Sequence, residues 1–119
     1  MSMKMLVQEN DGVIVVVMSG KLTIGEGASA LRNKIRELVA AGSRKILLNM
    51  ADVSYMDSSA IGELVGAHAH VVSAGGEMKL LNLAKHVHDL LVITKLYTVF
   101  EVFEDEATAI RSFAAVELA

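Results

Sequence analysis

Residues 45–76, KILLNMADVSYMDSSAIGELVGAHAHVVSAGG, join a short apolar run to a long amphipathic segment through a polar break. The run Ile46-Leu47-Leu48 is too apolar for a strand with one wet face, which predicts a central strand covered on both sides. Residues 50–57 are then expected to form a loop. A helix is predicted from Ser58 or Ser59 to about Ala74, because apolar side chains recur there at helical spacing until Gly75-Gly76 ends the pattern. A buried strand followed by a helix is typical of a parallel α/β sheet.

The residues before this stretch predict a hairpin and a first helix. Two segments rich in β-branched residues, 5–8 and 13–18, are separated by Asn10-Asp11-Gly12, which is a tight-turn signal. After Gly20, apolar residues recur at helical spacing up to Gly42, a typical helix stop. These apolar positions are Ala28, Leu31, Ile35, Leu38 and Val39.

The residues after Gly76 predict two further strands and two further helices. Strands are expected over residues 77–81 and 99–103. Asp105 is expected to cap the last helix. The inward positions of the two helices are Val87, Leu90 and Leu91 in the first, and Ile110, Phe113 and Ala114 in the second. The order ββαβαβαβα predicts a single α/β domain over residues 1–119, with about four helices and a mixed, mostly parallel sheet of about five strands.

The composition excludes several classes of function. The chain has 119 residues and no cysteine, which excludes disulfides, thiol nucleophiles and cysteine-ligated metals. Its net charge of −3 and the lack of a basic run argue against nucleic acid as a partner. No apolar run approaches the ~18 residues of a membrane span and no signal peptide is evident, so we expect a cytoplasmic protein without membrane contact. No hydrolase triad or phosphate loop is evident, so we expect neither an enzyme nor a bound cofactor.

The four histidines form two His-x-His pairs, His68/His70 and His86/His88. Both pairs lie in predicted helices, where positions two apart differ by about 200° around the axis. The two rings of a pair therefore point in nearly opposite directions and cannot share a metal ion. We expect one half-buried and one solvated ring in each pair, and no metal site.

The motif Met56-Asp57-Ser58-Ser59-Ala60-Ile61-Gly62 places three short polar side chains where the loop meets the second helix. Aspartate and serine are preferred N-cap residues, and one of them is needed to accept a hydrogen bond from the first-turn amides. On local physics alone, the motif is therefore a helix cap. Because a cap uses one side chain, a serine is left that can stand exposed at a helix end favourable to an added anion.

The second helix is expected to bury one stripe and to present small residues on the opposite side. The buried stripe consists of Ile61, Leu64, Val65, His68, Val71 and Val72. The outward side, found by stepping 100° per residue from Ile61, consists of Ser59, Glu63, Gly66, Ala67, His70 and Ala74. A solvated face usually carries long charged side chains, and a glycine such as Gly66 costs about 1 kcal/mol against alanine. The small residues predict a flat docking patch for another protein, with a chance run as the equal alternative. Glu63→Lys or Gly66→Arg should then abolish partner binding and leave stability nearly unchanged.

With these features together, the chain resembles a STAS domain of the anti-sigma factor antagonist family, the anti-anti-sigma factors of bacterial partner-switching pathways. The resemblance spans almost the whole chain. It is carried by Gly20-Lys21-Leu22, Ile46-Leu47-Leu48-Asn49, the motif at 56–62 and Gly75-Gly76-Glu77-Met78. Two positions depart from the family pattern, since Thr23 stands where an acidic residue is frequent and Ala60 where glycine is frequent.

The resemblance implies a phosphoacceptor at the first serine of the motif, Ser58, with Asp57 and Ser59 as its neighbours. It implies as partners an anti-sigma factor that is also an ATP-dependent serine kinase, and a metal-dependent serine phosphatase. The residues expected to contact the anti-sigma factor are Thr23, Glu63, Gly66, Ala67 and His70. A phosphate would add about −1.5 to −2 charges beside Asp57 and weaken binding by repulsion and desolvation, without a large conformational change. We expect a monomer or a weak dimer.

Two alternatives remain at this stage. One is a STAS switch with the same chemistry at Ser58 and a partner in secretion, biofilm formation or stress signalling. The other is a phosphoaspartate receiver domain, which has a similar length and element order. The receiver is disfavoured because Asn49 stands where its acceptor aspartate is expected and no acidic pair follows the first strand.

Overall fold

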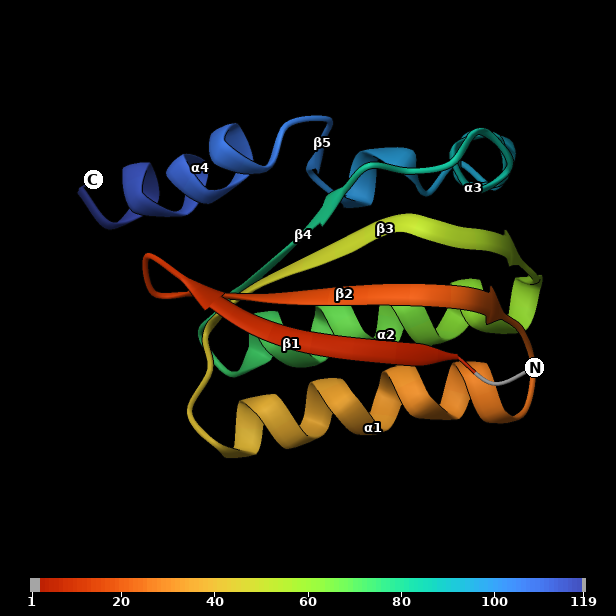
Figure 1. Ribbon diagram of the computed structural model, residues 1–119, viewed down its shortest axis with the longest axis horizontal. Coiled ribbons are helices and arrows are strands. Elements are labelled where there is room, and N and C mark those ends of the chain that lie inside the picture. Colours follow the sequence, from red (N-terminus) through yellow and green to blue (C-terminus); the bar gives the residue numbers. More distant parts are fainter. Residues whose placement is uncertain (1–2, 119) are drawn as a thin grey trace.

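Strands and helices alternate along the chain after an opening hairpin (Figure 1). The computed structural model describes residues 3–118, with the side chains of residues 3–113. The elements are β1 (Lys4–Asn10), β2 (Val13–Leu22), α1 (Glu26–Ala40), β3 (Lys45–Met56), α2 (Ser58–Ser73), β4 (Glu77–Leu81), α3 (Lys85–Ile93), the 3-10 helix η1 (Tyr97–Val99), β5 (Val102–Phe103) and α4 (Glu106–Leu118). This order confirms the predicted ββαβαβαβα pattern. The expectation for the side chain of Ala114 lies outside the described residues.

The sheet has the strand order β1-β2-β3-β4-β5. β1 and β2 pair antiparallel, and every later neighbour pairs parallel, which confirms the predicted mixed sheet. The hairpin turns at Asp11 and Gly12, whose φ angles of 53° and 81° are both positive. Such angles are typical of the two-residue turns that match the twist of a hairpin, so the Asn-Asp-Gly signal is confirmed.

β3 is longer than the sequence predicts. Residues 50–56 belong to the strand, where a loop was expected. The extension pairs with the second half of β2, for example Gly20 with Val53 and Leu22 with Met56, across two register shifts. These shifts break the simple alternation of apolar residues, and for this reason the pattern of residues 50–56 did not indicate a strand. The consequence is that β3 carries the chain directly to the start of α2.

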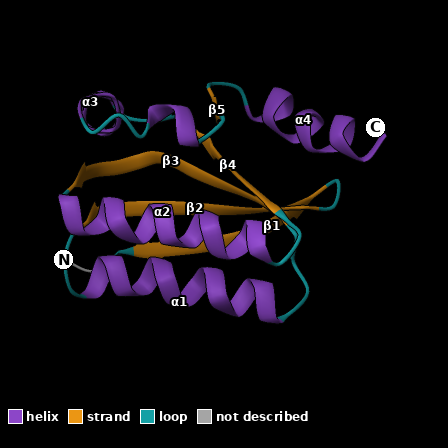
Figure 2. Cartoon of the chain, turned by 180° about the vertical axis from the view of Figure 1, so that it is seen from behind, coloured by secondary structure: helices purple, strands orange, loops and turns teal. Residues whose placement is uncertain are grey.

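The two faces of the sheet carry separate hydrophobic cores (Figure 2). α1 and α2 lie side by side on one face, where they pack with Ile46 and Leu48 of β3. α4 covers the other face, where Ile110 and Phe113 pack with Leu47. The run 46–48 thus faces both cores in alternation, which confirms the predicted central strand. α3 also contributes buried residues to the larger core.

The predicted fifth strand is largely replaced by other structure. Tyr97–Val99 form a 3-10 helix, and only Val102–Phe103 pair with β4. Lys95, with a positive φ of 63°, ends α3 and turns the chain into this short helix. The β-branched and aromatic residues around Glu101 within 99–103 did not distinguish a strand from a 3-10 turn that leads into one.

Gly27 fixes how closely α1 approaches the end of β2. A Cβ atom at this position would lie 2.8 Å from the carbonyl oxygen of Lys21, which is closer than real Cβ contacts allow. The first turn of α1 therefore sits directly against the chain that leaves β2. This close approach sets the position of the short connection through Thr23 and Ile24 beside the start of α2.

Candidate functional site

The start of α2 is organised by the carboxylate of Asp57. Its Oδ1 accepts a hydrogen bond from the Ala60 amide at 2.9 Å, which makes Asp57 the N-cap. Its Oδ2 accepts a second bond, also 2.9 Å, from the amide of Ile24, which is 33 residues earlier in the chain. The Asp57 amide in turn donates to the carbonyl of Leu22 at 3.3 Å. One side chain thus caps the helix and ties the β2–α1 connection to it.

These hydrogen bonds also determine the charge of Asp57. The bond from the Ile24 amide, followed by the bond from Ala60, lowers the pKa of the carboxyl group below its usual value of 3.8. Both bonds favour the ionised form, and desolvation opposes them only in part. Asp57 is therefore a carboxylate at neutral pH, with both oxygens already engaged.

Ser58 and Ser59 are both exposed in the first turn of α2. Among the described residues, none forms a hydrogen bond with either hydroxyl. The cap is made by Asp57, so the serine side chains are not needed for it. An enzyme can reach the Ser58 oxygen from solvent, and the helix end provides first-turn amides and a dipole that favour a negative group there.

The connection between β2 and α1 adds an apolar residue beside the two serines. Ile24 is 73% exposed, although its amide is held by Asp57. Thr23 is half-buried, and its carbonyl accepts a hydrogen bond from Ala28 at the start of α1. Ile24 is not among the site residues that the sequence predicts. An isolated large apolar residue within a predicted connection was the only signal available for it.

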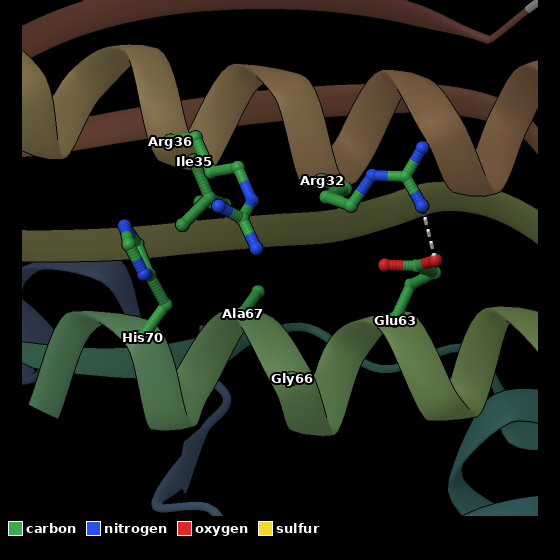
Figure 3. A pocket seen from close by; sticks show the side chains of 7 residues that line it. All are labelled: Arg32, Ile35, Arg36, Glu63, Gly66, Ala67 and His70. Atoms are coloured by element: carbon green, nitrogen blue, oxygen red, sulfur yellow. Dashed lines mark hydrogen bonds and ion pairs between the residues drawn. The ribbon is translucent and has the colours of Figure 1, made fainter. Parts of the chain in front are cut away.

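The predicted orientation of α2 is wrong for part of the helix. Ala67 was placed on the outward side but is only 6% exposed, and Val72 was placed in the buried stripe but is 50% exposed. Glu63 and His70 are half-buried on the side of α2 that faces α1, and Glu63 forms an ion pair of 2.9 Å with Arg32 (Figure 3). The reason is that α1 packs against this side, so the helix buries two neighbouring faces and not one stripe.

The exposed side of α2 still consists of small residues, at other positions. Gly62, Gly66, Ala69 and Ser73 are all exposed and follow Ser58 and Ser59 along one face of the helix. A Cβ atom at Gly62 or at Gly66 would meet nothing within 4 Å. The predicted docking patch is therefore displaced around the helix, and of its predicted residues Ser59 and Gly66 are exposed.

Three of the four histidines contact aromatic rings. The ring of His68 contacts that of Phe100 edge-on, with 5.2 Å between the ring centroids. His86 stacks on Tyr55 and His88 contacts Tyr97 edge-on, each with 4.9 Å between the ring centroids. Half-burial of His88 and exposure of His86 confirm the expectation for that pair, whereas His68 and His70 are both half-buried. Within residues 3–113, no three metal-ligating side chains gather into a group.

Asn49 is not at the end of its strand, contrary to the reasoning applied to a receiver domain. It lies within β3, between Val17 of β2 and Leu81 of β4. Its Oδ1 accepts a hydrogen bond from the Ala51 amide at 3.1 Å. The residue that follows the end of β3 is Asp57, whose oxygens both accept backbone hydrogen bonds.

Comparisons with known proteins agree with this architecture. The family model of the STAS domain matches residues 4–109. The anti-sigma-B factor antagonist of Bacillus subtilis (strain 168) is 32% identical over 102 residues, which are 86% of this chain and 92% of that protein. A crystal structure of an anti-sigma factor antagonist from Mycobacterium paratuberculosis has a TM-score of 0.83, with 21% identity and 95% of each chain covered.

A further solved structure with the same fold is of a phosphorylated protein. It is the Bacillus cell fate determinant SpoIIAA in the phosphorylated form, with a TM-score of 0.71 and 22% identity, covering 92% of this chain and 98% of that one. In the described part of the chain, no helix is long and apolar enough to cross a membrane. The family match over most of the chain and the agreement in fold lead to one conclusion: the chain belongs to the STAS domain family, with the anti-sigma factor antagonists as its relatives.

Proposed function

We propose that the chain is an anti-sigma factor antagonist that works as a phosphorylation switch. The unphosphorylated protein binds an anti-sigma factor that is also an ATP-dependent serine kinase, and phosphorylation of Ser58 releases it. A metal-dependent serine phosphatase restores the binding form. One observation carries the proposal: Asp57 alone caps α2, so that the Ser58 hydroxyl stands exposed and without a hydrogen-bond partner among the described residues.

The start of α2 suits a reversible phosphate. Ser58 is the first residue of the helix, where the positive end of the helix dipole stabilises a negative group. Its neighbour Asp57 is ionised at neutral pH, because hydrogen bonds from two amides lower its pKa. A phosphoserine at Ser58 would therefore add about −1.5 to −2 charges beside an existing −1, with the fold left intact.

The surface for the anti-sigma factor is proposed to surround Ser58. We name it the switch surface, and it consists of Thr23, Ile24, Ser58, Ser59, Gly62 and Gly66. Ile24 provides an exposed apolar anchor, and the glycines let a partner backbone approach α2 closely. Ala67 is no longer included because it is buried against α1, and Glu63 and His70 are half-buried toward that helix.

Release then follows from electrostatics at close range. Two unit charges 4 Å apart interact by about 4 kcal/mol at an effective dielectric constant of 20. Each 1.4 kcal/mol changes the affinity about tenfold. A phosphate in the middle of the switch surface must be desolvated or must face a partner carboxylate, so even strong screening leaves a loss of about two orders of magnitude in affinity.

A phosphorylation assay tests the proposal directly. The protein is incubated with the anti-sigma factor kinase encoded in the same genome and Mg-ATP, and the site is read by mass spectrometry. Wild type and Ser59→Ala should gain one phosphate, and Ser58→Ala should gain none. Ser59→Ala is the matched control because both serines are exposed in the same turn. Phosphate on Ser59 in the wild type, or none on either serine, would contradict the assignment.

A further inference from the structure

A small pocket lies between α1 and α2 (Figure 3). It has a volume of about 70 Å³. The residues that line it are Arg32, Ile35 and Arg36 from α1, and Glu63, Gly66, Ala67 and His70 from α2. A water molecule takes about 30 Å³ in the liquid, so this space has room for one carboxylate or phosphate group and not for a nucleotide.

The pocket has one more positive than negative side chain, because two arginines and one glutamate line it. Arg32 is neutralised by Glu63, with 2.9 Å between Nη1 and Oε2. Arg36 has neither an ion pair nor a hydrogen bond within the described part of the chain. The adjacent acidic residue, Glu37, is engaged by Lys34 at 2.9 Å. One guanidinium therefore faces the pocket without a counterion, in a chain whose net charge is −3.

His70 faces the same space from the opposite helix. Figure 3 shows its ring and the Arg36 guanidinium extending from α2 and α1 toward the gap between the helices. The ring is half-buried, and its nitrogens form no hydrogen bond with any described residue. In either tautomer an imidazole offers one N–H, and the guanidinium offers a planar set of donors. Donors from two helices thus converge on one small volume.

The remaining walls keep the space open and add one apolar side. Gly66 has no side chain and Ala67 has only a methyl group, so α2 does not fill the pocket. Ile35 is 1% exposed and forms an apolar wall. An apolar wall lowers the effective dielectric constant, which strengthens the attraction between the guanidinium and an anion.

We propose that the pocket between α1 and α2 is an oxyanion site, in which Arg36 and His70 bind a carboxylate or a phosphate group. The fork of a guanidinium matches the paired oxygens that both groups present. The carboxylate source would be an acidic side chain of a bound protein, and the phosphate source a free or covalently bound phosphoryl group. The pocket shares Gly66 with the switch surface, but the groups proposed to bind the anion, Arg36 and His70, lie outside that surface, and the proposal does not depend on phosphorylation of Ser58.

The test is an NMR titration of the ¹⁵N-labelled protein with sodium phosphate and, in a second arm, sodium acetate, each at constant ionic strength set with sodium chloride. Saturable shifts at the amides of Gly66 and Ala67, with a Kd of roughly millimolar order, support the site. Tighter binding of phosphate assigns a phosphoryl ligand, and equal or tighter binding of acetate assigns an acidic side chain. Shifts that stay linear for both anions overturn the proposal.

Variants separate this pocket from general charge effects. Arg36→Gln should lower the affinity for the anion by about tenfold. Arg111→Gln is the matched control, because Arg111 is an exposed arginine on α4, on the other face of the sheet, and binding should stay unchanged. Equal affinity in Arg36→Gln and wild type overturns the site. Ser58→Ala should bind the anions like wild type, so failure of the Ser58 switch and failure of this pocket are distinguishable.

Discussion

Two helices of this protein begin with an aspartate cap, and the two caps are built differently. At α4, Asp105 uses one oxygen for both of its bonds, which come from the amide and the hydroxyl of Thr108 at 2.9 and 2.8 Å. At α2, Asp57 divides its oxygens between Ala60 in the helix and Ile24 in a distant connection. The α4 cap is local, whereas the α2 cap is part of the tertiary structure.

The residues that follow the two caps differ in charge. In α4 the residue is Glu106, an acidic side chain that suits the positive end of the helix. In α2 it is Ser58, which is neutral and exposed. A negative charge at the first position of a helix is thus compatible with this fold. The unmodified Ser58 of α2 carries no such charge. Phosphorylation would give α2 the charge arrangement that α4 has permanently.

The largest expected effect is on partner binding when Ser58 is given the negative charge that Glu106 has in α4. Ser58→Asp should lower the affinity for the anti-sigma factor by about 100-fold relative to Ser58→Ala, because a carboxylate then stands beside Asp57 in the switch surface. Isothermal titration calorimetry measures both affinities. Ala107→Asp is the control, since it adds the same charge to the first turn of α4, and it should bind like wild type. Equal affinity of the two Ser58 variants would remove the electrostatic mechanism.

The next effect is the loss of thermal stability when each aspartate cap is removed. Asp105→Ala should lower the Tm by about 3–6 °C, which is the range for loss of one N-cap in a domain of this size. Asp57→Ala should lower it about twice as far, because the Ile24 amide also loses its acceptor. Thermal melts followed by circular dichroism at neutral pH measure both. Equal shifts would show that the bond to Ile24 adds nothing to stability.

A smaller effect is expected along the exposed face of α2. Gly66→Arg should reduce the affinity for the anti-sigma factor by roughly tenfold, since a long side chain then stands in the switch surface. Stability should rise slightly, because arginine has a higher helix propensity than glycine. Ala107→Arg on α4 adds the same side chain outside this surface and serves as control. A Gly66→Arg protein that is folded and binds normally would exclude this face from the interface.

The position of Glu63 against α1 changes what Glu63→Lys can test. The sequence places Glu63 on a free face, where the substitution should affect binding alone. In the structure Glu63 is half-buried and paired with Arg32, so a lysine there would place two positive charges together between α1 and α2. Any loss of binding would then be mixed with a change in helix packing, and Gly66→Arg is the cleaner variant.

The parts that sequence predicts well are those set by local chemistry. The hairpin turn at Asp11-Gly12, the buried strand at 46–48, the cap within the 56–62 motif and the Asp105 cap all depend on residues close in the chain, and the structure confirms them. The exposed face of α2 was misplaced because it depends on where α1 packs. The end of β3 was misplaced because its pairing with β2 passes through two register shifts. Both errors concern contacts between distant segments.

In the candidate site, too, the local features are predicted from the sequence and the contacts between distant segments are not. Asp57, Ser58 and Ser59 were identified from seven consecutive residues, because a helix cap is a local structure. Ile24 was missed because only the hydrogen bond from its amide to Asp57 brings it to the site, across 33 residues. A local motif thus indicates the proposed phosphoacceptor, and tertiary structure is needed to outline the proposed surface around it.

The smallest effect is the pH dependence of the two caps. In both aspartates the hydrogen bonds lower the folded-state pKa below the usual 3.8, so the charged form stabilises the fold above this pH and the gain is lost as the pH falls through the folded-state pKa. The difference in Tm between wild type and Asp57→Asn should therefore stay constant from pH 7 to 5 and shrink below about 4, since asparagine does not titrate. Asp105→Asn should show the same shape. At Asp57 backbone hydrogen bonds lower the pKa and no cation contributes, so its curve should be nearly independent of salt. At Asp105 the charge of Arg111 adds a smaller contribution to the hydrogen bonds from Thr108, so its curve should depend weakly on salt. A strong salt dependence at Asp57 alone would mean that its charge interacts with an ionic group as well as with the two amides.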